Sequence, residues 1–373
     1  MIPKSIKQNL LSDDKSIAQL NSSAFKLPKY DPLSYYRDIY QNDYFYALLN
    51  LRHYLKSASD YYFSNIQKAK NADLFILTPS IPSPAGPGSD SKPVPIKFGR
   101  LKTFLTDSSQ FGLEPLLLIK NIKKIYCYLP SIRGEDYDDR HLNQFFHFEA
   151  EIVGTLDNLI PIIEDYIKQL CETILLMNNT VNKISDNPQK TKKILKKIIK
   201  LNKFPKITFD EAVDILIKNK KEKFINFTKN GRDINAKGEI ELMKLLKLQS
   251  PLWVKYYDRD RVPFYQKPDP NNKDKTINAD LLFPPLKPGA FGGEIVGSGQ
   301  RQNNAKEIYE SFKRQGISPK PYEWYIDLRR QPNYKTTSGF GLGIERFIAW
   351  ALAKDNIRDV IFYPRLKNII SFP

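Results

Sequence analysis

Short runs of apolar residues, several of them ended by proline or glycine, predict β-strands in two separate parts of the chain. In the first part these runs cover residues 74–79, 103–106, 125–129 and 145–153. In the second part they cover residues 252–257, 262–265, 279–283, 294–296 and 325–328. Because the runs do not alternate with helices, as parallel βαβ units require, they favour an antiparallel sheet. We therefore expect an α+β fold in which helices flank an antiparallel β-sheet.

Apolar residues at helical spacing predict helices before and between the strand-rich parts. Residues 44–68 and 156–178 repeat apolar side chains every three or four positions. Residues 190–206 contain eight lysines and no acidic residue, in a pattern that favours a basic amphipathic helix. Residues 207–245 also have a mainly helical pattern. We therefore expect a helical insertion over about residues 180–245.

The two ends of the chain have different patterns. Residues 1–43 are polar and are interrupted by Pro28 and Pro32, which predicts an irregular N-terminal arm. Residues 44–373 are expected to form one domain that carries the helical insertion. Near its end, residues 339–353 predict a glycine-rich turn that leads into a helix.

Charge and composition narrow the class of protein. The chain has 58 Lys and Arg against 41 Asp and Glu, a formal net charge of +17 that favours polyanionic partners such as nucleotides or nucleic acid. Alternatively, the excess of lysine only keeps the protein soluble and indicates no binding partner. Two cysteines exclude a disulfide framework, and three histidines without a Cys/His cluster argue against structural zinc. No apolar run approaches the roughly 20 residues that span a bilayer, so we expect a cytoplasmic protein without a membrane partner.

A first group of ionic residues surrounds the predicted hairpin between residues 129 and 145. Arg133 offers a planar fork for a phosphate or carboxylate, and Glu135 can accept a hydrogen bond from an exocyclic amine. Arg140 and His141 can neutralise a polyphosphate, and Phe145 can stack on a purine. Taken alone, these residues fit a surface hairpin with salt bridges equally well.

A second group lies in the glycine-rich segment that ends at Arg346. Alternate glycines, among them Gly341 and Gly343, let the backbone approach a planar ligand closely. Arg346 then begins a helix, where phosphate charge is favoured. The chain has neither a GxxxxGK[ST] loop nor a GxGxxG fingerprint after a strand, so a nucleotide site here is of another type.

Two further groups contain carboxylates. Glu294 ends a strand before a glycine turn, where a carboxylate can hold Mg²⁺ together with phosphate oxygens, and Asp280 is a second candidate ligand. The alternative is that Glu294 lies at a strand end and simply pairs with Arg301. Glu149 and Glu151 lie on one face of a strand and, if buried, they mark a site for an ammonium, an amide or a metal. Ser108 and Gln110 are polar candidates that accompany them.

The order of these groups resembles the catalytic domain of class II aminoacyl-tRNA synthetases, most closely the asparaginyl/aspartyl subgroup. Pro79 is similar to the proline that closes the first motif of the family. Residues 133–145 are similar to the second motif, although the phenylalanine that precedes the arginine in the family is absent, and residues 339–346 match the third. Residues 294–301, Glu-Ile-Val-Gly-Ser-Gly-Gln-Arg, resemble a signature of the subgroup.

Other segments extend the resemblance over roughly residues 45–373. Residues 356–365 are similar to the C-terminal signature of the subgroup. Glu149-Ala-Glu151, residues 204–212 and Asp327-Leu-Arg-Arg330 are more like the asparaginyl than the aspartyl branch. The resemblance thus implies that residues 44–373 form a class II catalytic domain, which in this family is a homodimer built on the first motif.

The resemblance also implies a role for each candidate residue. Arg133, Glu294 and Arg346 would be the catalytic residues, and Glu294 would bind Mg²⁺, with Asp280 as a possible second ligand. The residues that would bind ATP, besides these, are Glu135, Arg140, His141, Phe145, Gly341 and Gly343. The residues that would bind the amino acid are Ser108, Gln110, Glu149, Glu151, Arg329 and Arg330. Among these, Glu149 and one of the two arginines would select the side-chain amide.

The implied activity is an ATP-dependent ligase that activates asparagine, aspartate or a close analogue as an aminoacyl-adenylate. The tRNA-reading β-barrel that precedes the first motif in the family has no counterpart in residues 1–43. We therefore expect an acceptor that is not read through an anticodon, such as ammonia, an amine, a peptide or a carrier. One alternative is a compact asparagine–tRNA ligase that uses its basic surface, and another is a non-catalytic RNA-binding or regulatory paralogue.

Three differences from the family pattern bear on the site. Residues 284–293 lengthen the loop before Glu294, which bears on the assignment of Asp280. Residues 331–337 replace the proline and histidine that the family has before the glycine-rich segment. That replacement predicts an altered pocket for the amino-acid side chain.

Overall fold

An eight-stranded β-sheet forms the centre of the protein in a computed structural model, which describes residues 2–20, 24–82 and 91–372. Its strand order is β1-β5-β6-β13-β12-β11-β10-β7. The strands are β1 (Lys70–Asn71), β5 (Lys124–Ile132), β6 (Gln144–Val153), β13 (Thr337–Gly343), β12 (Gly293–Gln300), β11 (Asn278–Phe283), β10 (Leu252–Lys255) and β7 (Lys206–Thr208). All neighbours pair antiparallel except β1 with β5 and β10 with β7, which are parallel. The expected α+β fold around an antiparallel sheet is confirmed.

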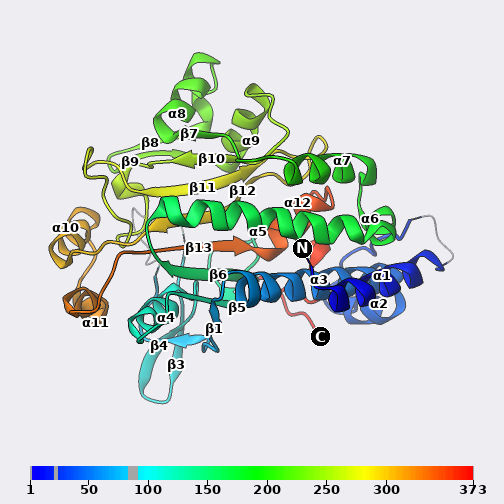
Figure 1. Cartoon of the computed structure of the whole chain (residues 1–373), viewed down its shortest axis with the longest axis horizontal. Coiled ribbons are helices and arrows are strands. Elements are labelled where there is room, and N and C mark those ends of the chain that lie inside the picture. Colours follow the sequence, from blue (N-terminus) through cyan, green and yellow to red (C-terminus); the bar gives the residue numbers. More distant parts are fainter. Residues whose placement is uncertain (1, 21–23, 83–90, 373) are drawn as a thin grey trace.

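A layer of helices covers one face of the sheet (Figure 1). The helices of this layer are α3 (Asp43–Tyr61), α5 (Leu156–Leu176), α6 (Asn178–Ile184), α7 (Pro188–Ile199) and α12 (Ile344–Ala351). The alternation of strand side chains explains this packing, because Phe148 and Ala150 of β6 point into the same apolar core as Phe340 and Leu342 of β13. Tyr166 of α5 fills that core from the helical side. The residues between them, which include Glu149 and Gly341, therefore face the opposite side of the sheet.

The remaining elements surround this two-layered body. Further helices are α1 (Lys4–Ala18), α2 (Tyr35–Gln41), α4 (Gln110–Leu113), α8 (Phe209–Lys218), α9 (Ala236–Leu245), α10 (Ala305–Gln315) and α11 (Glu323–Asp327). Shorter helical turns are η1 (Tyr62–Ile66), η2 (Glu114–Leu118), η3 (Glu222–Phe224), η4 (Arg259–Arg261), η5 (Lys320–Tyr322), η6 (Leu328–Arg330) and η7 (Ile357–Val360). A three-stranded sheet contains β2 (Leu77–Thr78), β4 (Leu101–Leu105) and β3 (Val94–Phe98), and β8 (Ile225–Thr228) pairs with β9 (Gly231–Ile234). The hairpin of β3 and β4 projects from the body in Figure 1.

The N-terminal residues are not an irregular arm, and that prediction is wrong. Helix α1 packs on α3 and α6, and its Leu10 and Ile17 are fully buried. The carboxylate of Asp14 accepts hydrogen bonds from the backbone N–H groups of Asn179 and Thr180, at the start of α6. Because Pro28 and Pro32 lie beyond α1, they do not interrupt it. The division of the chain at residue 43 stays a prediction.

Three predictions about the second half of the chain are also wrong. Residues 325–328 belong to α11 and η6 rather than to a strand, and residues 262–265 form no strand. Short apolar runs cannot be assigned by periodicity alone, and here Tyr325 and Phe264 pack into an aromatic cluster off the sheet. The glycine-rich segment is not a turn but strand β13, which pairs with β6 and β12 along its length. Its neighbours on both sides outweigh the poor strand propensity of glycine.

The predicted insertion is only partly helical. Helices α6, α7, α8 and α9 lie within it, but β7 joins the edge of the main sheet beside β10, and β8 and β9 form a hairpin in which Thr228 pairs with Gly231. Across the ranges described above, no helix is long and apolar enough to cross a membrane.

Candidate active site

Two rows of residues cross the open face of the sheet and form the floor of a cavity. In the first row, Glu149, Gly341, Gly297 and Asp280 are paired across β6, β13, β12 and β11. In the second row, Glu151, Gly339, Gly299 and Asn278 are paired in the same way. Each row thus has two glycines in the middle and a polar side chain at either end. The first-row glycines are the more open, since an added Cβ on Gly297 or Gly341 would be 3.3 Å from its nearest atom, whereas Gln266 and Glu151 lie directly over Gly299 and Gly339 of the second row.

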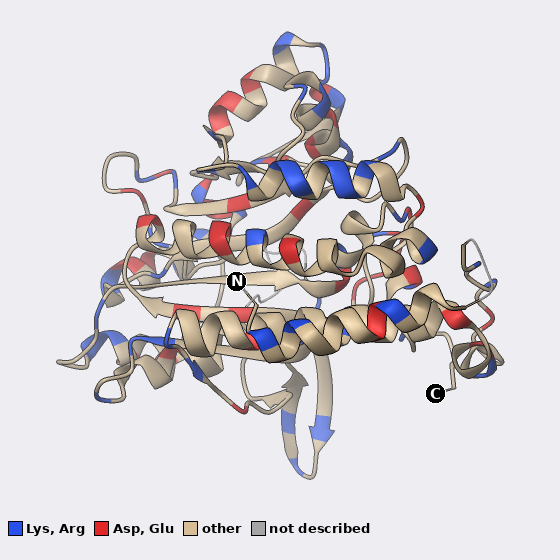
Figure 2. Ribbon diagram, turned by 45° about the vertical axis from the view of Figure 1, so that its right-hand side comes forward, with Lys and Arg blue, Asp and Glu red and all other residues tan. Residues whose placement is uncertain are grey.

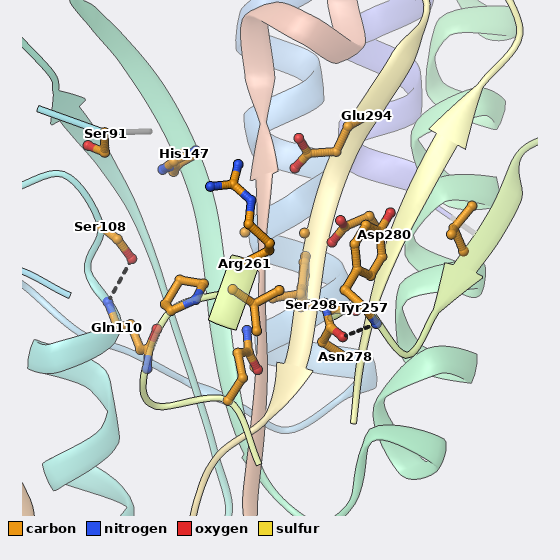
Figure 3. Close-up of a pocket in the computed structure, with 18 of the residues that line it drawn as sticks. Ser91, Ser108, Gln110, His147, Tyr257, Arg261, Asn278, Asp280, Glu294 and Ser298 are labelled. Carbon is orange, nitrogen blue, oxygen red and sulfur yellow. Dashed lines mark hydrogen bonds between the residues drawn. The ribbon is translucent and has the colours of Figure 1, made fainter. Parts of the chain in front are cut away.

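The cavity above these rows has a volume of about 610 Å³. Of the candidate residues, those that line it are Ser108, Gln110, Arg133, Glu135, His141, Glu149, Glu151, Asp280, Glu294, Gly341 and Arg346. A smaller adjoining cavity is lined by Arg140, Phe145 and Gly343. Arg133 and Arg346 line both cavities. Figure 3 shows the larger cavity, with Glu294 at one end and Gln110 near the other. Residues far apart in the sequence therefore meet in one site, as Ser108 and Arg346 do.

Arginines gather at the end of the cavity that holds Glu294. Arg346 donates a hydrogen bond from Nη1 to Oε2 of Glu294 at 3.2 Å. The guanidinium of Arg133 lies 5.3 Å from the ring centre of Phe145, and that of Arg140 lies 4.4 Å from the ring centre of Phe291. The Nε atoms of Arg133 and Arg140 are buried and make no hydrogen bond to any described residue. This end of the site thus offers guanidinium donors that an anion can use.

The histidines near these arginines are held in the neutral form. Burial, together with the charge of Arg346, lowers the pKa of His141. Burial also lowers the pKa of His147 well below its usual value, and Arg133 and Arg346 act in the same direction. Nδ1 of His147 lies 2.9 Å from the hydroxyl of Ser131. These shifts favour the uncharged form of both imidazoles, although the carboxylate of Asp138, 2.8 Å from Nδ1 of His141, opposes the shift of that residue.

Asp280 and Glu294 lie on adjacent strands and approach the same point. A Cβ atom built on Gly297 would be 3.3 Å from Oε1 of Glu294 and 3.6 Å from Oδ1 of Asp280. Figure 3 shows both carboxylates directed toward the same space. Burial and the charge of Glu294 raise the pKa of Asp280 well above its usual range. Two carboxylates that repel each other in this way fit Mg²⁺, which takes one or two carboxylates and completes its shell with water and phosphate oxygens.

Glu239 is a third carboxylate beside this pair, and the sequence did not point to it. It lies on α9, and its Oε2 accepts a hydrogen bond from the backbone N–H of Glu294 at 2.9 Å. Burial and the charge of Glu294 raise the pKa of Glu239 to about 7, although Arg140 opposes the shift. The insertion thus contributes a residue to the cavity. The only signal in the sequence is Asn235, a residue type that caps helices, which predicts that Glu239 lies in the first turn of a helix.

Glu149 of β6 lies at the end of the first row opposite Asp280. Its Oε1 accepts a hydrogen bond from the hydroxyl of Ser108 at 2.7 Å, and its Oε2 accepts one from the backbone N–H of Ser109. Burial raises the pKa of Glu149, and these hydrogen bonds and Arg133 oppose the shift. Nε2 of Gln110 is buried at the cavity and has no partner among the described residues. The backbone N–H of Gln110 donates to the hydroxyl of Ser108, so Ser108, Gln110 and Glu149 lie together in one polar cluster.

The second row ends in an ion pair between Glu151 and Arg301. Nε of Arg301 donates to Oε1 of Glu151 at 3.2 Å, and its Nη2 donates to the same atom. Burial raises the pKa of Glu151, and the charge and hydrogen bonds of Arg301 oppose the shift. Both side chains are almost fully buried. Their opposite charges leave this end of the cavity close to neutral overall.

The structure does not bring Arg329 or Arg330 into either cavity. Arg329 is fully buried against Glu114, and it also donates hydrogen bonds to the carbonyl oxygens of Gln302 and Tyr325. Its guanidinium lies 5.0 Å from the ring centre of Tyr334, which belongs to the altered segment 331–337. Arg330 is exposed and its nearest acidic partner is Asp327, at 3.9 Å. The predicted role of these arginines in selecting an amide therefore has no support from their positions.

Several lining residues were missed by the sequence analysis. They are His147, Asp233, Glu239, Tyr257, Arg261, Tyr265, Gln266 and Asn278. Most come from irregular segments or from the insertion, where no motif marks them. Asn278 could have been predicted, because it lies two residues before Asp280 on the same strand and therefore faces the same side of the sheet.

Comparisons with known proteins agree with this geometry. Residues 38–367 match the family of tRNA synthetases class II (D, K and N). The asparagine–tRNA ligase of Mycoplasma genitalium is 31% identical over 348 residues, which cover 88% of this chain and 71% of that protein. The asparagine–tRNA ligase of Pyrococcus furiosus is 32% identical over 273 residues, which cover 72% of this chain and 58% of that protein.

Among solved structures, the asparaginyl-tRNA synthetase of Pyrococcus horikoshii complexed with asparaginyl-adenylate is similar with a TM-score of 0.78. It is 27% identical, and the match covers 90% of this chain and 72% of that one. The chain belongs to the class II tRNA synthetases of the D, K and N group, as the resemblance implied. It is therefore an enzyme of the ligase class.

Proposed function

We propose that this protein activates asparagine with ATP to form asparaginyl-adenylate and pyrophosphate. The observation that carries the proposal is the single cavity in which Arg133, Arg346, Asp280 and Glu294 line one end and Ser108, Gln110 and Glu149 the other. That arrangement suits a triphosphate beside a small zwitterion. The relatives that are named asparagine–tRNA ligases support asparagine as the amino acid.

The proposed reaction needs no protein nucleophile. The carboxylate of the amino acid attacks the α-phosphorus in line, one carboxylate O–P bond forms, and the bond to pyrophosphate breaks. Arg133 neutralises charge at the α-phosphate, and Arg346 holds the leaving pyrophosphate. Arg140 and His141 bind the outer phosphates. Phe145 stacks on the adenine, which Glu135 recognises through its exocyclic amine.

Asp280 and Glu294 would hold Mg²⁺ in this proposal. The ion, when bound, offsets phosphate charge and fixes the bend of the triphosphate. The role of the protein is to keep two oxygen ligands on adjacent strands, with Arg346 in contact with one of them. Ser108, Glu149 and Gln110 orient the amino acid so that its carboxylate faces the phosphate.

The charge balance of the second row favours asparagine over aspartate. Arg301 is paired with Glu151 and Arg329 with Glu114, so neither arginine is available to neutralise a second substrate carboxylate. An uncharged amide is better matched to this end of the cavity.

Amino-acid-dependent exchange of labelled pyrophosphate into ATP tests the activation step. We expect exchange with asparagine and little or none with aspartate or the other amino acids. If none of the twenty amino acids supports exchange, the proposed activation of a standard amino acid is refuted.

The acyl acceptor is a separate question. The names of the relatives support tRNA, whereas the sequence analysis favoured ammonia, an amine, a peptide or a carrier. Incubation of the enzyme with asparagine and ATP, with tRNA, ammonium or hydroxylamine added in parallel, distinguishes these acceptors. Acid-precipitable asparagine that depends on tRNA would establish the tRNA ligase, and product formation only with an amine would establish the other class.

A further inference from the structure

A buried ion pair joins the long helix α3 to the start of α12, beside the smaller cavity. Nη2 of Arg52 on α3 lies 2.7 Å from Oε1 of Glu345 on α12, and the two side chains are only 10% and 1% exposed. Nη1 of Arg52 also donates a hydrogen bond to the carbonyl oxygen of Val360 at 2.9 Å. A buried pair of this kind stabilises a fold little more than apolar side chains of similar volume do. Stability alone therefore does not account for its place beside the site.

The second oxygen of Glu345 holds the backbone of β6 at the point where the neighbouring strand ends. The pairing of β13 with β6 stops at Gly343, which lies opposite His147. Phe146 is the next residue of β6 beyond that pairing, and its backbone N–H donates a hydrogen bond to Oε2 of Glu345 at 2.9 Å. A backbone N–H at the end of a ladder still needs an acceptor. The carboxylate of Glu345 thus takes the place of the missing strand.

Both ends of this contact adjoin residues of the proposed ATP site. Phe145 precedes Phe146 in the chain and Arg346 follows Glu345, and both line the smaller cavity together with Glu345. In the proposed function Phe145 stacks on the adenine and Arg346 holds the leaving pyrophosphate. One carboxylate therefore fixes the main chain beside two groups that bind opposite ends of the same ATP molecule.

We propose that Arg52 and Glu345 are positioning residues that hold Phe145 and Arg346 at the separation which ATP requires. The inference rests on the proposed binding of ATP and adds two residues that act through their neighbours. Arg52 takes part because it neutralises the buried carboxylate and anchors it to the main chain at Val360. A ligand that engages both binding groups gains affinity from their fixed separation, whereas a ligand that engages only one of them does not.

The test replaces the ion pair by apolar side chains of similar volume, Arg52→Met together with Glu345→Met, which leaves no unpaired charge in the core. Titration calorimetry measures the Kd for ATP, and competition with ATP measures the Kd for adenosine and for inorganic tripolyphosphate. We expect the Kd for ATP to rise about tenfold, since the hydrogen bond that fixes Phe146 is lost. The other two Kd values should stay within about twofold, because each ligand needs only one of the two groups. Glu345→Leu replaces Glu345→Met if the methionine variant does not fold.

Arg52→Met together with Glu345→Gln is the conservative variant. The amide oxygen of glutamine can still accept the N–H of Phe146, so this variant should bind ATP within about threefold of the wild type. It differs from the first variant only in the side chain at position 345. If it binds ATP as weakly as the first variant does, the hydrogen bond to Phe146 is not the cause and the inference is overturned.

Asp14→Leu is the matched control. Asp14 is also a buried carboxylate that accepts hydrogen bonds from backbone N–H groups, but it lines neither cavity. This control should leave all three Kd values unchanged, whatever its effect on the melting temperature. An unchanged Kd for ATP in the Arg52→Met, Glu345→Met variant would overturn the inference. An equal loss for ATP and for either smaller ligand would also overturn it, because the ion pair would then support one binding group rather than the separation of two.

Pyrophosphate exchange separates this inference from the proposed function. If the wild type binds ATP but no amino acid supports exchange, the proposed activation fails, and weaker binding of ATP alone by the variant still supports the positioning role. If the wild type does not bind ATP at all, both are refuted.

Discussion

At the scale of single residues, the site depends on a few guanidinium and carboxylate groups whose partners leave part of each group free. Arg346 contacts Glu294 through one nitrogen, and the Nε of Arg133 has no partner among the described residues. Arg329, by contrast, uses all three of its nitrogens within the protein. Pairing within the protein therefore distinguishes Arg329 from Arg133 and Arg346, which we propose to bind the substrate, a distinction that the sequence motif does not make.

Replacement of Arg346 by alanine should lower the rate of pyrophosphate exchange by about 10²–10³-fold, the usual effect of removing one preorganised group that stabilises transition-state charge. Exchange kinetics measure the effect, and circular dichroism shows whether the fold is kept. Arg330→Ala is the matched control, since Arg330 is half exposed and lies outside both cavities. A near-normal rate for Arg346→Ala would rule out its proposed phosphate role.

Alanine substitutions in the two rows of glycines should have different effects, one on stability and the other on ATP binding. A methyl group at Gly339 would displace the buried carboxylate of Glu151 from Arg301, so Gly339→Ala should lose about 1–3 kcal/mol of stability. At Gly341 the nearest atom is 3.3 Å from the new methyl group, so Gly341→Ala should fold normally but bind ATP weakly. Urea unfolding and nucleotide titration distinguish the two. Equal stability of both variants would contradict the register described here.

At the scale of secondary-structure elements, the insertion is tied to the main sheet by a charged network. Arg232 of β9 donates hydrogen bonds to both carboxylate oxygens of Asp258, and Lys275 pairs with Asp258 and Asp210. These contacts join the β8–β9 hairpin and α8 to the segment before β11. They fix the orientation of the insertion, whose helix α9 brings Glu239 into the cavity.

This network predicts a pH dependence of stability. Burial alone would raise the pKa of Asp258, but hydrogen bonds from Arg232 and Lys275 outweigh it and hold the pKa at about 2, below the ordinary 3.8. A carboxylate with a lowered pKa stabilises the fold above its unfolded pKa, and that stability is lost as the pH falls from about 4 toward 2. The difference in unfolding free energy between wild type and Asp258→Asn should therefore shrink over this range. A constant difference would show that the charge of Asp258 is not responsible.

Much of the site could be predicted from the sequence because its motifs carry residue types with few chemical alternatives. Arg133, Glu149, Glu294 and Arg346 all line the predicted site. The secondary-structure elements were harder to predict. The short apolar pattern of residues 325–328 is compatible with a strand as well as with the helix that is observed. Gln266 could not be found in this way. It lines the cavity because the irregular segment before β11 brings its side chain over Gly299 of β12, and only the folded chain reveals this contact.

At the scale of the whole molecule, two surfaces lie outside the cavity. One is a groove beside the start of α3, lined by residues that include Tyr40, Tyr46, Leu49 and Tyr363. These four side chains are between 41% and 70% exposed, which is unusual for large apolar groups lying together. The other is the outer face of α7, where lysines form the blue bands seen in Figure 2.

The groove is our candidate interface for the homodimer that the resemblance implied, because its exposed side chains are large and apolar. We predict a dimer at micromolar concentration and a folded monomer for Leu49→Asp, since a buried charge would disfavour the interface. Sedimentation velocity measures both. Leu11→Asp is the control, because Leu11 is also exposed but lies on α1 outside the groove. A wild type that sediments as a monomer would refute the prediction.

The lysines of α7 are on the far side of the helical layer from the cavity, because Ile194, Leu195 and Ile198 pack inward. Exchange of Lys193, Lys196, Lys197 and Lys200 for glutamine should therefore leave asparagine-dependent pyrophosphate exchange unchanged. If tRNA binds there, its affinity should fall and become less sensitive to salt. Filter binding over a range of salt concentrations tests this, and an unchanged salt dependence would remove α7 from the RNA surface.

The glycine rows also have a consequence for ligands that compete with the substrates. At Gly297 and Gly341 of the first row the base of the cavity is main chain, which has no rotamers, so this part of the base cannot rearrange to admit an oversized molecule as a side-chain wall can. Inhibitors that are flat on their lower side should bind, and close analogues with a single branch there should be excluded by collision alone. Selectivity in such a series would be abrupt rather than graded.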